Sequence, residues 1–294
     1  MKMRLASLIA VLFGLAAANA EASETALPAL ADPGAAVFKL SARDGTGKVK
    51  FGSAVLIAPG RLLTACHVAR GAELIQVHRG AAKLTVKPAF MDIEHDLCVL
   101  SAPDLLASVT AEVATPGELK IGDEVVAVGY PRGGKLAVSE GRLKAVHRHG
   151  AVRVLQVSAP FDYGQSGGAL FDITGRLVGI TAFKALAGGD FHFALGSEGI
   201  NEEELKRQAT VPQSAGPKTA FWERAAQTQP LFLRAASHEA NGDWKALLGV
   251  AQQWTASDST NSASWLALWR ALSSLKREQD ADFALVRAAA LSQH

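Results

Sequence analysis

Short apolar segments separated by turn signals run through residues 34 to 197 of the chain. They are rich in Val, Ile, Leu and Phe, and dipeptides such as Asp44-Gly45 and Pro59-Gly60 lie between them. We expect strands at 35–40, 48–57, 74–78, 83–87, 97–100, 124–129, 152–157, 169–171 and 177–183. Many short strands at roughly ten-residue spacing favour an all-β sandwich or a pair of barrels over βαβ units.

The pattern changes after about residue 200, where Pro, Ser and Gly at 211–218 indicate a linker, which we place at 201–218. Beyond it, apolar residues such as Leu247 and Trp254 recur at three- and four-residue steps, the period of amphipathic helices. The expected helices are 219–240, with a kink or restart near Pro230, 243–254, 263–276 and 279–292. A small all-α domain of helical hairpins is therefore predicted at 219–294.

The five tryptophans all lie in this last quarter of the chain, and the β-rich part has none. Such a split indicates two bodies with separate cores. Helices joined by short turns would stack as hairpins, and residues 265–271 and 281–290 resemble a hairpin of the tetratricopeptide type. A helical cap packed on the β-rich body is the alternative.

The first twenty residues have the features of a secretory signal peptide. Lys2 and Arg4 precede an uncharged apolar stretch at 5–18, and small residues follow at Ala18 and Ala20. A retained single-span anchor is the alternative, although the stretch is short for one. We expect an exported chain, periplasmic rather than extracellular, with no stable membrane span once residues 1–20 are removed.

Composition narrows the class of protein without naming a function. The chain has 294 residues, of which 49% are hydrophobic, enough for packed cores and against wholesale disorder. Lys and Arg number 30 against 28 Asp and Glu, a balance that does not indicate a nucleic-acid partner. The two cysteines, Cys66 and Cys98, match no zinc motif, and the sequence leaves open whether they form a disulfide or stay free thiols.

Three local motifs contain the residue types of one reaction. They are LTACHV at 63–68, HDLCVL at 95–100 and GQSGGAL at 164–170. A serine hydroxyl such as that of Ser166 is a weak nucleophile unless a neighbouring base takes its proton, and His67 supplies an imidazole for that task. The imidazole needs a fixed tautomer and a nearby negative charge, which Asp96 would supply. The order His, Asp, Ser occurs in one of the convergent serine-protease arrangements.

Glycines around Ser166 would let the backbone bend so that two N–H groups converge. These would be the amides of Gly164 and Ser166, aimed at the oxygen that becomes negative during attack. We therefore expect an oxyanion hole at these two residues.

With these motifs in place, residues 34–200 resemble the trypsin-like, chymotrypsin-fold serine proteases, and in particular their bacterial HtrA/Deg-type branch. The segments that carry the likeness are the three motifs together with 119–131, 138–143, 175–180 and 191–195. The resemblance implies a mainly β fold with two six-stranded antiparallel barrels. It also implies that the protein hydrolyses protein or peptide substrates. Relatives commonly carry a PDZ module after the protease, whereas here the tail is helical.

The substrate pocket is harder to read. In trypsin-like enzymes, cleavage after Lys or Arg needs an acid six residues before the nucleophile, and here that position is Pro160. With Ala182 and Phe191 as walls, we expect a small or medium apolar side chain in the pocket. Asp162 would either face the pocket or cap a loop, and the loop is the preferred interpretation.

His147 and His149 lie two residues apart among Arg and Lys, which favours an exposed polar stretch over a metal site. No cofactor and no metal is expected. The sequence predicts an exported serine endopeptidase acting through an acyl-enzyme. The alternative is a catalytically silent protease-fold scaffold whose helical C-terminal region binds a protein partner.

Overall fold

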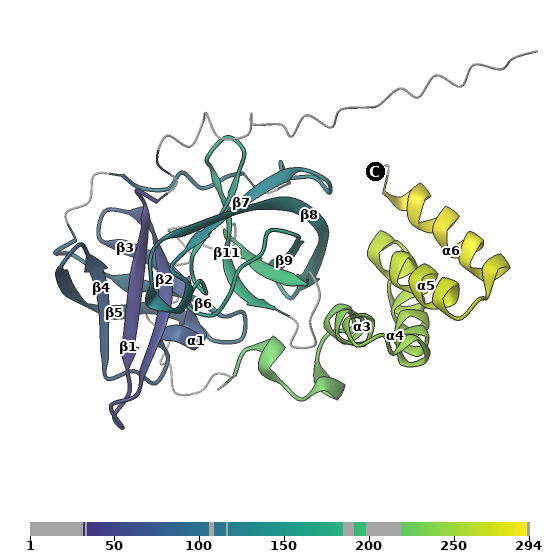
Figure 1. The fold of residues 1–294 in the computed structure, drawn as a ribbon, viewed down its shortest axis with the longest axis horizontal. Helices are drawn as coiled ribbons and strands as arrows, with labels where there is room; N and C mark the ends of the chain where they lie inside the picture. The colour runs from purple at the N-terminus through teal and green to yellow at the C-terminus, as the bar shows by residue number, and fades with distance from the viewer. Residues whose placement is uncertain are drawn as a thin grey trace, which may run out of the picture.

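The computed structural model describes residues 32, 34–105, 109–115, 117–184, 191–197 and 219–292. Strands β1–β6 form one closed barrel and β7–β12 a second (Figure 1). The strands of the first barrel are β1 (Val37–Arg43), β2 (Val49–Ala58), β3 (Arg61–Ala65), β4 (Leu74–Arg79), β5 (Ala82–Asp92) and β6 (Leu97–Ser101). Those of the second are β7 (Glu124–Gly129), β8 (Ala137–His149), β9 (Val152–Val157), β10 (Ala169–Asp172), β11 (Leu177–Lys184) and β12 (His192–Gly196).

Every strand pair in the two barrels is antiparallel, and the strand orders are β1-β2-β3-β6-β5-β4 and β10-β11-β12-β9-β8-β7. Closure removes the unpaired edges that an open sheet would expose. The predicted pair of six-stranded antiparallel barrels is confirmed. Short helical turns interrupt the chain at α1 (Cys66–Ala69) and η1 (Pro131–Gly133).

The C-terminal region begins with two 3₁₀ turns, η4 (Phe221–Glu223) and η5 (Ala226–Thr228). Helices α3 (Leu231–Ala240), α4 (Trp244–Ser257), α5 (Ser262–Ser274) and α6 (Glu278–Leu291) follow. The helix expected from residue 219 is therefore wrong in its first part, and Pro230 precedes the first α-helical residue of α3. Proline fixes φ and lacks an N–H, so it suits a helix start and not a helix interior.

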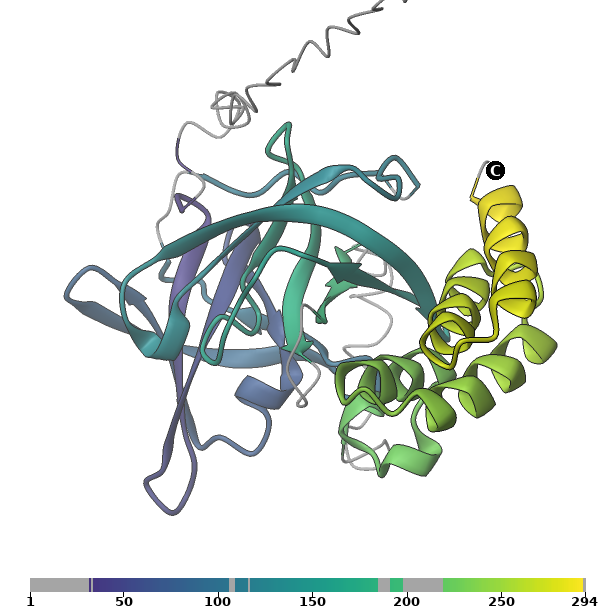
Figure 2. The same ribbon diagram turned by 45° about the vertical axis from the view of Figure 1, so that its right-hand side comes forward.

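The expectation of separate cores is also wrong. Phe221, Phe232 and Trp254 belong to the same continuous cluster of buried apolar residues as the barrel strands. Figures 1 and 2 both place the helical region on the side of the second barrel. Within residues 219–230, Trp222 contacts His67 of α1, and Glu223 pairs with Arg70, which follows α1. We call residues 219–230 the docking segment. Within the described helices, the far end has a small cluster of its own, around Leu272, Ala281 and Ala284.

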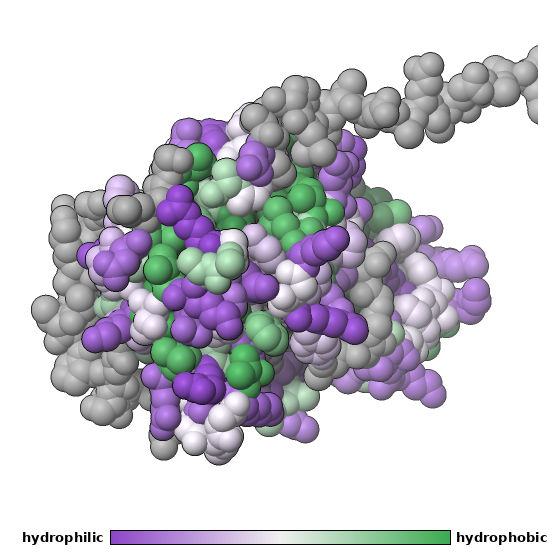
Figure 3. All heavy atoms as spheres, turned by 60° about the vertical axis from the view of Figure 1, so that its left-hand side comes forward, coloured by the Kyte–Doolittle hydropathy of each residue, from purple (hydrophilic) through white to green (hydrophobic). Residues whose placement is uncertain are grey.

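The remaining surface is mixed. On the face in Figure 3, hydrophobic residues are scattered among hydrophilic ones. No helix in the described ranges is both long and apolar enough to cross a membrane. The signal peptide expected at 1–20 and the linker expected at 201–218 lie outside the described residues.

Candidate functional site

His67 lies on α1, directly after β3 enters the core. Ala65 and Cys66 are fully buried, whereas the His67 side chain remains 20% exposed. The amide of Arg70 donates to the carbonyl of Cys66 and closes the short turn. The turn thus directs an imidazole out of the barrel while its backbone stays anchored.

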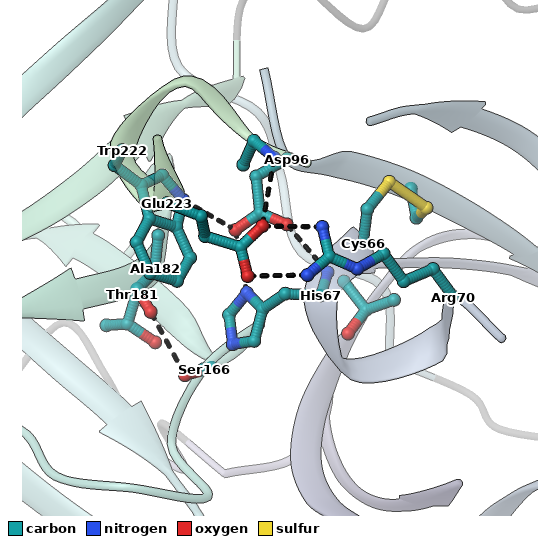
Figure 4. A network of polar contacts seen from close by, with 12 residues as sticks. Cys66, His67, Arg70, Asp96, Ser166, Thr181, Ala182, Trp222 and Glu223 are labelled. Carbon is teal, nitrogen blue, oxygen red and sulfur yellow. Dashed lines mark hydrogen bonds and ion pairs between the residues drawn. A yellow bond between two sulfur atoms is a disulfide. The ribbon is translucent and has the colours of Figure 1, made fainter. Parts of the chain in front are cut away.

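Asp96 precedes β6 and is fully buried. Its Oδ1 accepts from the backbone N–H of His67 at 2.7 Å, and its Oδ2 lies 2.7 Å from His67 Nδ1. Asp96 also has φ of +61°, a region that non-glycine residues seldom adopt. The backbone of Asp96 is held by three hydrogen bonds. His67 makes two of them to the carboxylate, and the amide of Cys66 donates the third to the Asp96 carbonyl. With Nδ1 bound to Asp96, the opposite edge of the imidazole faces Ser166 (Figure 4).

Ser166 lies in the loop between β9 and β10. Gly164 and Gly167 flank it with φ of +90° and +82°. A Cβ at Gly164 would lie 2.4 Å from the amide nitrogen of Arg132, and one at Gly167 would lie 2.3 Å from the carbonyl oxygen of Ser53. Only glycine fits these positions, because they combine a left-handed backbone with close approach of other main chain.

The Ser166 hydroxyl donates to the carbonyl of Ala182 at 3.0 Å. Both His67 and Ser166 line one cavity, together with Asp162. The structure thus brings the three predicted motifs to one place, with the imidazole between the carboxylate and the hydroxyl, although the hydroxyl's hydrogen bond goes to a carbonyl (Figure 4).

The loop that presents Ser166 is held by Ser53 of β2. The Ser53 hydroxyl donates to the carbonyl of Gly164 at 3.0 Å and accepts from the amide of Tyr130, and the Ser53 amide donates to the carbonyl of Ser166. Among the described residues, the N–H groups of Gly164 and Ser166 have no hydrogen-bond acceptor. These two amides remain the predicted donors of an oxyanion hole.

Cys66 and Cys98 are joined by a disulfide, with their Cα atoms 4.9 Å apart. Cys66 adjoins His67, and Cys98 lies on β6 two residues after Asp96. The bond therefore connects the backbones that carry the imidazole and its carboxylate partner. It closes a loop of 32 residues, worth about 3–4 kcal/mol in the chain-entropy description.

The cavity beside Ser166 has partly different walls from those expected. Its lining consists of His67, Phe161, Asp162, Tyr163, Ser166, Ala182, Phe183, Lys184 and Trp222. Ala182 is where the sequence placed it, but Pro160 and Phe191 are not among these walls. Pro160 is exposed, and its carbonyl accepts from Ser139. Phe191 lines a second cavity, between the second barrel and α3–α5, together with Phe232.

Asp162 does line the cavity, so its interpretation as a loop residue alone is incomplete. Its carboxylate lies 2.8 Å from Lys184 Nζ and 3.1 Å from the guanidinium of Arg132. The hydrogen bond from Lys184, followed by that from the Tyr163 amide, lowers the pKa of Asp162 to about 2. The carboxylate is thus already paired within the protein, which makes it a poor partner for a cationic substrate side chain.

Trp222 is the residue at this site that sequence reasoning missed. Its indole N–H donates to Asp96 Oδ2 at 3.2 Å, and its ring meets His67 edge to face with centroids 5.2 Å apart. It also stacks on Phe183 at 4.8 Å. The helix expected at 219–240 includes Trp222, and no local signal in the sequence connects it with Asp96, 126 residues away.

His147 is not part of an exposed polar stretch, because only 4% of it is accessible. It stacks on Phe232 with ring planes 7° apart, and its Nε2 lies 3.1 Å from Gln156 Oε1. Burial lowers the pKa of His147 to about 4, and the Gln156 contact only partly offsets this. The residue therefore marks the junction between the second barrel and the helices. Groups of three or more metal-ligating side chains are absent from the described ranges.

Comparison with known proteins places this geometry in context. Residues 52–180 match the family described as trypsin-like peptidase domain. A serine protease of Mycobacterium tuberculosis is 27% identical over 180 residues, covering 58% of this chain and 45% of that protein. The periplasmic serine endoprotease DegP of Salmonella typhimurium is 32% identical over 148 residues, covering 47% of this chain and 31% of that protein. This chain thus spans less than half the length of these relatives.

Solved structures agree. The crystal structure of a Yersinia pestis serine endoprotease superposes with a TM-score of 0.55 at 27% identity, covering 61% of this chain and 65% of that one. The active form of the Mycobacterium tuberculosis protease has a TM-score of 0.56 at 24% identity, covering 64% of this chain and 87% of that one, a likeness of fold alone. Taken with the two barrels, these findings show that residues 52–180 match a trypsin-like peptidase domain and that the chain has HtrA/DegP-type serine protease homologues.

Proposed function

We propose that the chain is an exported serine endopeptidase in which Ser166 is the nucleophile, His67 the base and Asp96 the group that orients His67. The observation that carries the proposal is the position of the His67 imidazole, bound to a buried carboxylate on one side and facing Ser166 across a shared cavity on the other. An imidazole held in one tautomer by Nδ1 presents a free Nε2 to a hydroxyl.

In this mechanism the Ser166 hydroxyl rotates from the Ala182 carbonyl toward His67, which takes its proton as the oxygen attacks the scissile carbonyl carbon. The amides of Gly164 and Ser166 stabilise the negative oxygen that forms. His67 then gives the proton to the leaving amine, the C–N bond breaks, and an acyl-enzyme remains. Water, activated by the same imidazole, hydrolyses the ester and frees Ser166.

The cavity supports an apolar specificity. Phe161, Ala182 and Phe183 supply apolar walls, and the negative charge of Asp162 is already paired with Lys184. We propose that peptides with a small or medium apolar side chain at the cleaved position are the preferred protein or peptide substrates.

Export to the periplasm is part of the proposal. The basic, apolar and small-residue order of 1–20 supports it, the DegP relative is periplasmic by name, and a disulfide persists in an oxidising compartment. Fractionation of cells that make the full chain, with sequencing of the mature N-terminus, tests this. Intact Met1 in the cytoplasmic fraction would contradict it.

A scaffold without activity is the second candidate, because the Ser166 hydroxyl donates to Ala182 and not to His67. In that case the helical region, with exposed Phe283, Leu285 and Val286 on α6, would bind a protein partner. Its helical hairpins resemble the tetratricopeptide type in sequence alone.

A fluorophosphonate probe separates the two candidates. If the chain is an endopeptidase, the wild type should be labelled and should cleave casein. Ser166→Ala should lose both the labelling and the casein cleavage while keeping its melting temperature. Ser158→Ala is the control, because Ser158 is a loop serine whose hydroxyl accepts a hydrogen bond from the Arg142 amide. Absence of labelling in folded wild type over a range of pH and substrates would favour the scaffold.

A further inference from the structure

The buried carboxylate of Asp96 has a donor that comes from outside both barrels. His67 supplies two of its hydrogen bonds, and the indole N–H of Trp222 supplies a third at 3.2 Å. Trp222 lies beyond residues 52–180, the part that matches the peptidase domain family, and belongs to the docking segment that leads into the helices. The site is therefore completed by the C-terminal region.

We propose that Trp222 is a positioning residue for the His67–Asp96 pair, an inference that rests on the proposed serine-protease function. Asp96 is fully buried, and a buried carboxylate needs hydrogen bonds to replace those of water. Oδ2 receives both the imidazole and the indole, so the indole limits the rotation of the carboxylate about its last bond. The edge-to-face contact at 88° limits the tilt of the His67 ring from the other side.

Trp222 is itself held in place by contacts on both flanks. The Phe221 amide donates to the Glu94 carbonyl at 3.1 Å, and the Phe221 side chain is fully buried. Glu223 forms a two-pronged ion pair with Arg70, and the Arg224 guanidinium pairs with the Glu94 carboxylate. Trp222 also stacks on Phe183 with planes 16° apart. The indole therefore has little freedom, as a positioning group requires.

The partners of the docking segment are the backbones that carry the catalytic pair. Arg70 directly follows the α1 turn that contains His67, and Glu94 is two residues before Asp96. Movement of the docking segment would thus reach the imidazole and the carboxylate together. The helical region is in this way coupled to the site through Trp222, and the docking segment cannot be a passive linker.

The test is Trp222→Phe, which keeps an aromatic ring against His67 and Phe183 but removes the N–H. We expect kcat for a peptide ester to fall about tenfold with KM within about twofold, because a hydrogen bond to a charged group is lost while the wall of the cavity remains. Trp222→Leu, which also lacks the aromatic edge, should lose at least as much. Trp269→Phe, in α5 and away from the cavity, is the control and should keep wild-type kcat.

A second readout does not depend on turnover. The downfield proton NMR resonance of the hydrogen between His67 Nδ1 and Asp96 should move and exchange faster with water in Trp222→Phe. An unchanged kcat with an unchanged resonance would overturn the positioning role, even in an active enzyme. If wild type fails to label with fluorophosphonate, the protease function fails, and the resonance alone still decides whether Trp222 holds the pair. Thermal melting of each variant separates this effect from unfolding.

Discussion

The guanidinium of Arg70 binds both carboxylate oxygens of Glu223 at 2.5 Å, joining the end of α1 to a segment 153 residues further along the chain. Both side chains are about one-fifth exposed, so water screens the pair only in part. Burial raises the pKa of Glu223, but the hydrogen bonds from Arg70 and the Ala220 amide outweigh it and leave that pKa below its usual value. The ion pair thus attaches the C-terminal region beside His67.

The first prediction concerns this pair. Arg70→Gln and Glu223→Gln should each destabilise the protein, and the double variant should lose less than the sum, with a coupling energy of about 1–2 kcal/mol. Urea unfolding of the four proteins measures it. Arg277→Gln with Asp280→Asn, a more exposed pair in the helices, is the matched cycle and should couple by less than about 0.5 kcal/mol. Equal coupling in the two cycles would contradict the anchoring role of Arg70.

The second prediction concerns Asp96→Asn. An amide in place of the carboxylate favours the wrong imidazole tautomer, so kcat should fall about 10³- to 10⁴-fold with little change in KM. Asp92→Asn is the control, because Asp92 also lies 2.7 Å from a histidine, His95, but that histidine does not line the cavity. Steady-state kinetics on a peptide ester compare the two, and similar losses in both variants would argue against the special role of Asp96.

The third prediction concerns the glycine that shapes the proposed oxyanion hole. In Gly164→Ala the new methyl group would press on the main chain of Tyr130 and Arg132, so the loop must shift and one oxyanion donor is misplaced. We expect kcat to fall about 10²- to 10³-fold. Gly47→Ala has a similar φ of +85° but open space around it. It should cost stability alone and keep kcat, which separates backbone strain from displacement of the loop.

The fourth prediction concerns pH. Burial lowers the pKa of His147 from 6.5 to about 4 in the folded protein, so the unfolded chain binds the proton more readily. The contribution of the neutral His147 ring to the free energy of unfolding is fully present above pH 6.5. It is lost as pH falls toward 4, by an amount on the order of 2–3 kcal/mol. Urea unfolding at pH 7 and pH 4.5 should show a smaller pH dependence for His147→Phe, which keeps the stacking on Phe232. An identical pH dependence in the two proteins would refute this.

The fifth prediction concerns the disulfide. Reduction, or replacement of Cys66 and Cys98 by Ala, should lower the free energy of unfolding by about 3–4 kcal/mol, because the unfolded chain regains the freedom of a closed loop. Since the bond joins the backbones of the proposed catalytic pair, kcat should fall as well. Activity and urea unfolding before and after treatment with a thiol measure both effects, and a reduced protein with full stability would contradict the expectation.

Local sequence patterns predicted short strands in a sandwich or a pair of barrels and located the three motifs, whereas the two six-stranded barrels were implied by the family resemblance. Alternating apolar residues specify a strand through its immediate neighbours, and glycines on either side of Ser166 indicate a tight loop through their own backbone freedom. The pairing of Asp96 with His67 depends instead on the pairing of β3 with β6, which local patterns do not specify. It was expected from the order of the three motifs and from the family resemblance.

The walls of the cavity and the docking segment depend on tertiary structure. The pairing of β11 with β12 shifts register between Thr181 and Phe183, and such a shift changes which side chains share a face. Phe183 lines the cavity, whereas Phe191, expected as a wall, lines a second cavity with residues of α3–α5. The contact of Trp222 with Asp96 was hidden for a related reason, since composition assigned the tryptophan to a separate body.

The position of Trp222 in the chain has a consequence for biosynthesis. A polypeptide emerges from the ribosome, and crosses a membrane if exported, with its N-terminal end first. Both barrels are complete by Gly196, so they can close before the indole is present. Until residue 222 follows, Asp96 has only the donors that its own barrel provides. If Trp222 positions the His67–Asp96 pair as proposed, the nascent chain would gain full hydrolytic competence late, after both barrels have already formed.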